Sequence, residues 1–207
     1  MPTPVGHSLS GAVIYALTTK SENLVTSWRW GVTCMLAAAL ADVDFLPAMF
    51  GDLNLANSVH RYLTHTLLFA VVVGLAALGI LKVLGKPRPI RNSAVLFSCL
   101  VAHIFLDLLG KDFRPPIGVP FLWPFVRRSF KLPVQIFPSL LKDTYAEIVS
   151  FHNVGVVAVE VLMLGGLFGI VVGVKKWRGA RGRGNQPGSH RGHGKEERSA
   201  AVSDLSL

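Results

Sequence analysis

The residues best suited to chemistry in this chain are imidazoles and carboxylates set in apolar sequence. They occur at His7 and in three short motifs, A-D-V-D-F-L-P (Ala41–Pro47), H-R-Y-L-T-H-T (His60–Thr66) and A-H-I-F-L-D (Ala102–Asp107). Imidazole nitrogen and carboxylate oxygen are ligands that suit zinc, manganese or iron. Charged groups at membrane depth are costly unless they are paired or hydrated, so they usually line the interior of a helical bundle. The residue types therefore indicate a divalent metal site.

The spacing of the histidines constrains how they can meet. His103 and Asp107 are four residues apart, so they share one helical face and can bind one ion together. His60 and His65 are five apart and would diverge on a regular helix. We therefore expect His60 at or before a helix start and His65 in the first turn of that helix.

The two aspartates of the second motif pose a similar problem. Asp42 and Asp44 cannot both face one site on an ideal helix. Pro47 follows shortly and indicates that the helix ends there, which would let both carboxylates turn inward. Asp44 alone also fits an ordinary helix-end acid, Arg61 an interfacial anchor, and Glu160 an isolated buried acid.

The elements that must position these residues are membrane helices. Of the 207 residues 51% are hydrophobic and 16% are charged, against roughly 25% charged in soluble domains. A bilayer core of ~30 Å needs about 20 residues of helix. Five apolar segments are visible, Gly6–Leu17, Gly31–Phe50, Thr66–Leu84, Ala94–Gly110 and Asn153–Val174. We predict an all-α, polytopic membrane bundle of about four to five helices, in which the short first segment penetrates the bilayer halfway.

Up-and-down alternation of these segments brings the candidate acids and imidazoles to one end, together with Arg61. His7, Asp42, Asp44, His60, Arg61, His65, His103, Asp107 and Glu160 then lie at or near the same end of the bundle. Lys and Arg dominate the other end. The Pro-rich connection Lys111–His152 would lie as a lid or interfacial segment over the first end.

The net charge of +9 is unevenly distributed along the chain. The part from Lys175 onward holds eight Lys or Arg and only three acids. We divide the chain into a membrane-embedded domain, 1–176, and a disordered basic tail, 177–207. By the positive-inside rule the protein is a multi-pass inner or plasma membrane protein with a cytoplasmic tail. The bilayer is its expected partner, with anionic lipid contact through the tail. No nucleic acid is expected, and no protein partner is indicated.

These motifs resemble the YdjM-type family of inner-membrane-associated metal-dependent hydrolases, also described as LexA-binding. G-V-P-F-L-W-P-F (Gly118–Phe125) and V-E-V-L (Val159–Leu162) extend the resemblance over roughly residues 5–175. A Gly often follows the His-Arg pair in the family, where this chain has Tyr62. The resemblance implies a divalent metal, with zinc preferred and manganese or iron as alternatives. The ligands it implies are His7, Asp42, His60, His65, His103 and Asp107, with Asp44 and Glu160 as further candidates.

The resemblance implies hydrolysis of a phosphoester or lipid-like substrate at the membrane surface. In that hypothesis Arg61 steadies an anionic oxygen, and Asp44 or Glu160 acts as general base. Two alternatives remain open. One is an ion transporter or channel, although transport sites usually lie near the midplane of the membrane. The other is a non-catalytic membrane scaffold with a structural metal, although such sites are closed by four protein ligands.

Overall fold

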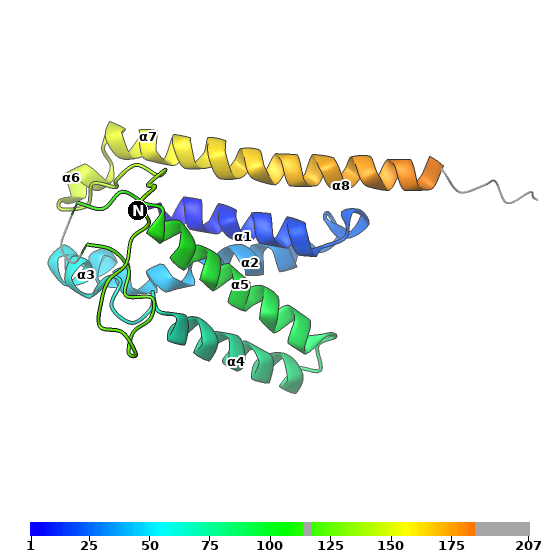
Figure 1. Ribbon diagram of the computed structural model, residues 1–207, viewed down its shortest axis with the longest axis horizontal. Coiled ribbons are helices and arrows are strands. Elements are labelled where there is room, and N and C mark those ends of the chain that lie inside the picture. The colour runs from blue at the N-terminus through cyan, green and yellow to red at the C-terminus, as the bar shows by residue number, and fades with distance from the viewer. Residues whose placement is uncertain (114–116, 185–207) are drawn as a thin grey trace, which may run out of the picture.

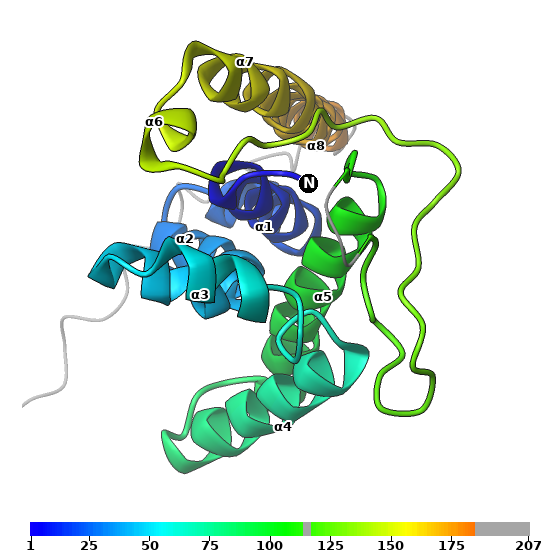
Figure 2. The same cartoon turned by 90° about the vertical axis from the view of Figure 1, so that its left-hand side faces the viewer.

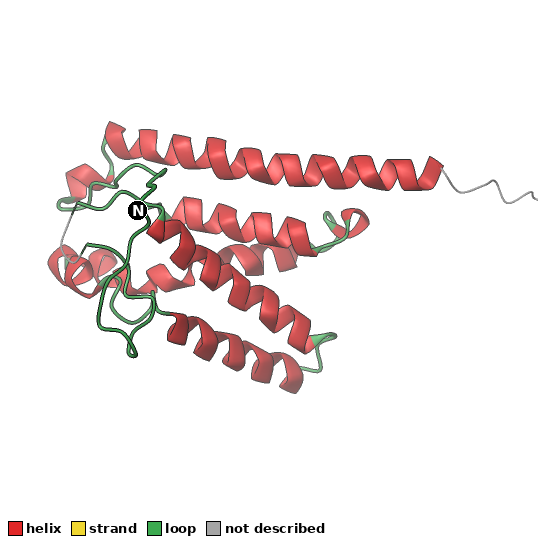
Figure 3. Ribbon diagram, in the orientation of Figure 1, coloured by secondary structure: helices red, strands yellow, loops and turns green. Residues whose placement is uncertain are grey.

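The computed structural model describes residues 1–113 and 117–184. All regular structure in these ranges is helical, and the loops carry only two isolated β-bridges (Figure 3). The predicted all-α class is confirmed. The elements are α1 (Pro4–Thr18), η1 (Ser21–Asn23), α2 (Trp28–Ala39), η2 (Leu40–Phe50), α3 (Leu53–Val59), α4 (Leu67–Val83), α5 (Pro89–Leu108), α6 (Tyr145–Ile148), α7 (Phe151–Glu160), η3 (Val161–Gly165) and α8 (Gly166–Gly184).

The long helices run back and forth along one axis, as the sequence predicted. In Figure 1, α1, α4 and α7–α8 run in one direction, whereas α2 and α5 return. The chain start, α3, α6 and the long irregular connection after α5 gather at one end, at the left of Figure 1. We call this end of the bundle the site end. The tight turn between α4 and α5 lies at the opposite end.

Three helices among the described residues are long and apolar enough to cross a membrane. They are Trp28–Phe50, Pro89–Leu108 and Phe151–Arg181, and α4 is a shorter apolar helix of 17 residues. Large apolar side chains on their outer faces are exposed, for example those of Leu75 and Leu162. A bilayer would cover such faces, which supports the predicted polytopic membrane protein.

The short helix α1 lies in the middle of the bundle. Figure 2 shows it between α7–α8 on one side and α2 and α5 on the other. Gly11 permits the close approach to α2, because a Cβ atom there would lie 2.3 Å from the carbonyl oxygen of Cys34. Cys34 and Cys99 pack with Tyr15 in one buried cluster, as small apolar residues. The predicted half-penetrating segment is therefore the core helix.

The last membrane helix holds α1 at both ends. Glu160 accepts hydrogen bonds from the backbone N–H groups of Thr3 (2.7 Å) and Gly6 (3.1 Å) and from the Thr3 hydroxyl. Lys175 donates to three carbonyl oxygens at the other end of α1, those of Ala16, Leu17 and Thr19. An acid at the N-terminus and a lysine at the C-terminus satisfy free backbone groups and complement the helix dipole.

Two features were not evident in the sequence. Helix α3 is too short and polar to stand out as an apolar segment, and Asp52 caps it by accepting from the Leu55 N–H. Helix α8 continues to Gly184, past the expected boundary at residue 176. The rest of the basic tail, 185–207, lies outside the described residues, so the two-part division remains a prediction.

Candidate metal centre

Eight of the nine residues singled out in the sequence come together at the site end. His7 lies on α1, Asp42 and Asp44 on η2, His60, Arg61 and His65 between α3 and α4, and His103 and Asp107 on α5. We call His7, Asp42, His60, His65, His103 and Asp107 the His/Asp cluster. His7, His65 and His103 are completely buried. Residues from four separated parts of the chain thus form one interior polar site.

The middle of the cluster is the gap between His65 and His103. Their Nε2 atoms lie 3.1 Å apart. Asp107 Oδ2 lies 3.3 Å from His65 Nε2 and 3.7 Å from His103 Nε2. Asp42 Oδ1 lies 3.7 Å and 3.6 Å from the same two nitrogens. Two carboxylates therefore flank a pair of facing imidazole nitrogens.

His7 completes the cluster from the α1 side. Its ring stacks on His103 with centroids 3.5 Å apart, and its Nε2 lies 3.4 Å from Asp107 Oδ1. Candidate ligand atoms of His7, His103 and Asp107 lie within 4.8 Å of one another. Those of Asp42, His60 and His65 form a second such group. The chain can thus offer three ligands on each side of the site.

A layer of acceptors orients the imidazoles. His60 Nδ1 donates to Asp44 Oδ1 at 2.7 Å, and His103 Nδ1 donates to the Ala38 carbonyl oxygen at 2.7 Å. Thr64 donates its hydroxyl proton to Asp44 Oδ2, so its oxygen accepts from His65 Nδ1 at 2.9 Å. Each ring thereby leaves Nε2 as the free nitrogen facing the site. Protein metal sites commonly orient their histidines in this way.

Many buried polar atoms of the cluster have no hydrogen-bond partner. They are both nitrogens of His7, both carboxylate oxygens of Asp42 and of Asp107, and Nε2 of His60. Buried polar groups are normally satisfied, and leaving one unpaired costs about 1–3 kcal/mol. A cation coordinated by these atoms would satisfy several at once. The residues present therefore fit a divalent metal.

The chain geometry around Asp42 explains how both aspartates reach the site. Helix α2 tightens into the 3-10 segment η2, which contains Pro47 and ends at Gly51. Asp42 points to the His65–His103 gap, whereas Asp44 lies behind His60 and His65, with Oδ2 3.4 Å from His65 Nδ1. Asp42 thus lies near Nε2 of the His65 ring and Asp44 lies near Nδ1. The two carboxylates flank the two nitrogens of one imidazole and need not share one face of a helix.

The loop between α3 and α4 differs in detail from the prediction. His60 directly follows the last residue of α3, which agrees with a place outside α4. His65 is not in the first turn of α4, because Thr66 is the N-cap and accepts from the Phe69 N–H. Arg61 takes a positive φ of 68°, and its N–H donates to Asp44 Oδ2 at 2.9 Å. This bend turns both imidazoles inward.

Glu160 is the one of the nine residues whose hydrogen bonds go to the backbone at the start of α1 and to Thr3, and not to the site. Both of its oxygens accept from the start of α1. The helix continues beyond it as a π-helical turn, η3. This position favours a structural contact over a place among the ligands.

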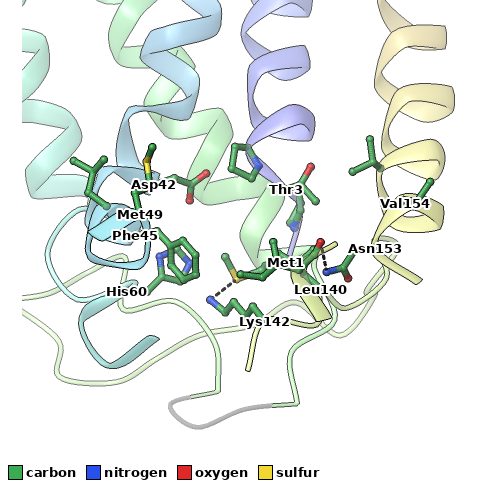
Figure 4. A pocket seen from close by; sticks show the side chains of 15 residues that line it. Met1, Thr3, Asp42, Phe45, Met49, His60, Leu140, Lys142, Asn153 and Val154 are labelled. Atoms are coloured by element: carbon green, nitrogen blue, oxygen red, sulfur yellow. Dashed lines mark hydrogen bonds between the residues drawn. The ribbon is translucent and has the colours of Figure 1, made fainter. Parts of the chain in front are cut away.

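Two cavities reach the His/Asp cluster. One is about 540 Å³ and mostly apolar, with Asp42 and His60 in its wall. Figure 4 shows Phe45 and Met49 on one side of it and Val154 on the other. The second is about 530 Å³ and is lined by polar groups, including Arg61 and His60.

Sequence reasoning missed four charged residues that line the second cavity, Lys111, Asp112, Lys142 and Asp143, and two of them have a clear part in the site. Asp112 accepts from Arg61 Nη1, and Lys142 lies among the lining residues. Both fall in the irregular connection after α5, where no periodic pattern marks a position as inward-facing. Burial, and after it the Arg61 charge, lower the pKa of Lys142 to about 8, against the opposing carboxylates of Asp107, Asp42 and Asp112.

Local electrostatics favour a cation between the rings. Burial lowers the pKa of His65, but its contacts with Asp107, Asp42 and Asp44 outweigh burial and raise that pKa well above its usual value. Burial dominates at His60 and lowers its pKa in spite of Asp44, which keeps Nε2 available as a ligand. The carboxylates around His65 attract either a proton or a metal ion to the same position.

Comparisons with curated proteins and with solved structures give no match. A family model does match, and it covers residues 1–179, which include all of the His/Asp cluster and every long helix except the last turns of α8. By this match, the chain belongs to the YdjM inner membrane protein family.

Proposed function

We propose that this membrane protein is a metal-dependent hydrolase that acts on a phosphoester in a lipid-like substrate. The observation that carries the proposal is the set of buried, unpaired imidazole and carboxylate atoms that converge beside two cavities. His7, His103 and Asp107 would hold an ion on one side, and Asp42, His60 and His65 on the other. Zinc is the expected metal, with manganese or iron as alternatives. When bound, such an ion polarises a phosphoryl oxygen and lowers the pKa of water.

The chain's own residues would orient the reactants. In the hydrolysis, water adds to phosphorus, the phosphoester P–O bond breaks, and a proton reaches the leaving oxygen. Arg61 is 7% exposed, and its Nε has no hydrogen-bond partner, so this side chain can donate to an anionic oxygen in the polar cavity. Asp44 accepts three donors and supports a role in positioning His60 and His65. Glu160 accepts from the backbone N–H groups of Thr3 and Gly6, which supports a role in positioning the start of α1.

The cavities favour an enzyme over the two alternatives. A structural metal is usually enclosed by four protein ligands. Here Asp42 and His60 belong to the cluster and also line a cavity. A transport site is expected near the membrane midplane, whereas this cluster lies at the site end of the bundle. The position suits a reaction at the membrane surface.

The orientation of the protein in the membrane is also part of the proposal. Lys82, Lys86, Arg88 and Arg91 lie around the α4–α5 turn, at the end opposite the site. By the positive-inside rule that end and the C-terminal tail face the cytoplasm, and the site faces the other side of an inner or plasma membrane. A cysteine introduced as Lys86→Cys should then react with a membrane-impermeant thiol reagent only after the cells are opened.

The function is tested by hydrolysis assays on the full chain in lipid nanodiscs supplied with zinc, manganese or iron. A chromogenic phosphodiester and phospholipids serve as substrates. Asp107→Ala should lose both bound metal and hydrolysis. Hydrolysis that survives in Asp107→Ala, or a wild-type protein that binds metal but cleaves no phosphoester, would overturn the proposal.

A further inference from the structure

The two cavities at the His/Asp cluster share a wall. Both are lined by Met1, His60, Leu140 and Lys142. Each has a volume within the ~300–1,000 Å³ usual for small-molecule sites. They differ sharply in chemistry, so together they form an apolar compartment and a polar compartment that meet beside His60.

The apolar cavity lies between two candidate membrane spans. Phe45 and Met49 of η2 lie on one side, and Val154 of α7 lies on the other (Figure 4). Leu46 of η2 and Val157 of α7 also line the cavity. Met49 is 80% exposed and Val154 is 61% exposed. Because both belong to helices that would face lipid, this cavity is accessible sideways from the bilayer rather than only from water.

The polar cavity carries a positive lining. Arg61, Lys111 and Lys142 contribute three cations, and Asp112 and Asp143 contribute two carboxylates, of which Asp112 pairs with Arg61. The unpartnered Nε of Arg61 adds a buried donor. Such a lining complements a phosphate group, which accepts charge-assisted hydrogen bonds from Arg and Lys.

We infer that the two cavities together bind an anionic phospholipid, with an acyl chain between η2 and α7 and the phosphate at Arg61 and Lys142. The lipid enters laterally from the bilayer. This placement puts the phosphoester bond beside His60, where the two compartments meet. As a substrate assignment the inference rests on the proposed function, but lipid binding itself can be measured without any hydrolysis.

The apolar compartment is tested by filling it. Detergent-purified full-length protein is titrated with phosphatidylglycerol, and retained lipid is counted by native mass spectrometry. Val157→Trp should weaken retention about tenfold or more, because the acyl chain loses its cavity. Val159→Trp is the matched control, since Val159 lies on the same helix outside the cavity and is 38% exposed. Equal retention by both variants would contradict the inference.

The polar compartment is tested by the choice of headgroup. Wild type should retain anionic phosphatidylglycerol over zwitterionic phosphatidylcholine, and Lys142→Gln should reduce that preference several-fold. Lys131→Gln, in the same connection but outside the cavity, should leave it unchanged. Equal binding of the two lipids by wild type would overturn the assignment of the phosphate to this cavity.

Metal content measured in the same samples separates this inference from the proposed function. Anionic lipid binding without stoichiometric metal would leave the lipid site standing and refute the hydrolase. Stoichiometric metal with hydrolysis of a soluble phosphodiester, but no lipid retention, would keep the hydrolase and refute the lipid site.

Discussion

The Nε2 atoms of His65 and His103 face each other at 3.1 Å in the buried centre of the bundle. Each ring already donates from Nδ1, to Thr64 in one case and to the Ala38 carbonyl in the other. Two facing nitrogens that both carry lone pairs repel each other unless a cation lies against them. A metal ion satisfies both, together with the carboxylates beside them.

Removal of the carboxylate behind the histidines should weaken the metal site without removing a ligand. Asp44→Ala leaves His60 and His65 without a shared acceptor, so metal affinity should fall about 10–100-fold. Competition with a metal-sensitive dye measures this. Asp52→Ala is the control, because it removes only the cap of α3. An unchanged affinity in Asp44→Ala would show that Asp44 does not orient the ligands.

Glu160 should matter for stability more than for chemistry. Glu160→Ala leaves the buried N–H of Thr3 without its acceptor, at a cost of about 1–3 kcal/mol, and leaves the Gly6 N–H with only the long bond of 3.4 Å to the Thr3 hydroxyl. The melting temperature in detergent should fall clearly. Glu160→Gln keeps one acceptor oxygen and should be intermediate. If Glu160→Gln retained stability and metal but abolished hydrolysis, Glu160 would instead be a proton-transfer residue.

The contact between α1 and α2 should not tolerate a methyl group. In Gly11→Ala the added Cβ would lie 2.3 Å from a backbone carbonyl oxygen, so the helices must separate. We expect a loss of a few kcal/mol, seen as a lower melting temperature. Gly79→Ala, where no atom lies within 4 Å, should be neutral or stabilising. Equal behaviour of the two variants would argue against this packing.

Anionic lipid binding should depend on pH through Lys142. Its pKa is lowered to about 8, chiefly by burial and then by the charge of Arg61, whereas Asp42, Asp107 and Asp112 oppose the shift. The ammonium is present below that pKa and is lost as pH rises through it. Preference for phosphatidylglycerol should therefore decline between about pH 7 and 9. Lys142→Arg should keep the preference at high pH, since Arg stays charged. A pH-independent preference in wild type would contradict this role.

The sequence was sufficient to predict the helical architecture and to predict that the candidate residues gather at one end of the bundle. Apolar runs of membrane length predict the helices, and their alternation predicts that His7, Asp42 and His103 share one end. The contacts that depend on irregular backbone were not predictable. The positive φ of Arg61 directs His60 and His65 inward, and no periodicity marks it. Lys142 likewise lies in irregular chain, and Glu160 meets α1 only through tertiary packing.

The most direct test is the metal content of purified protein, determined by elemental analysis for wild type, His65→Ala and His103→Ala. His152→Ala is the control, because His152 is exposed and its Nε2 donates to the Ser139 carbonyl oxygen, outside the His/Asp cluster. We predict near-stoichiometric zinc, manganese or iron in wild type and His152→Ala, and loss of the metal in the other two variants. A wild type that binds no metal even after reconstitution, or variants that keep it, would contradict the metal centre.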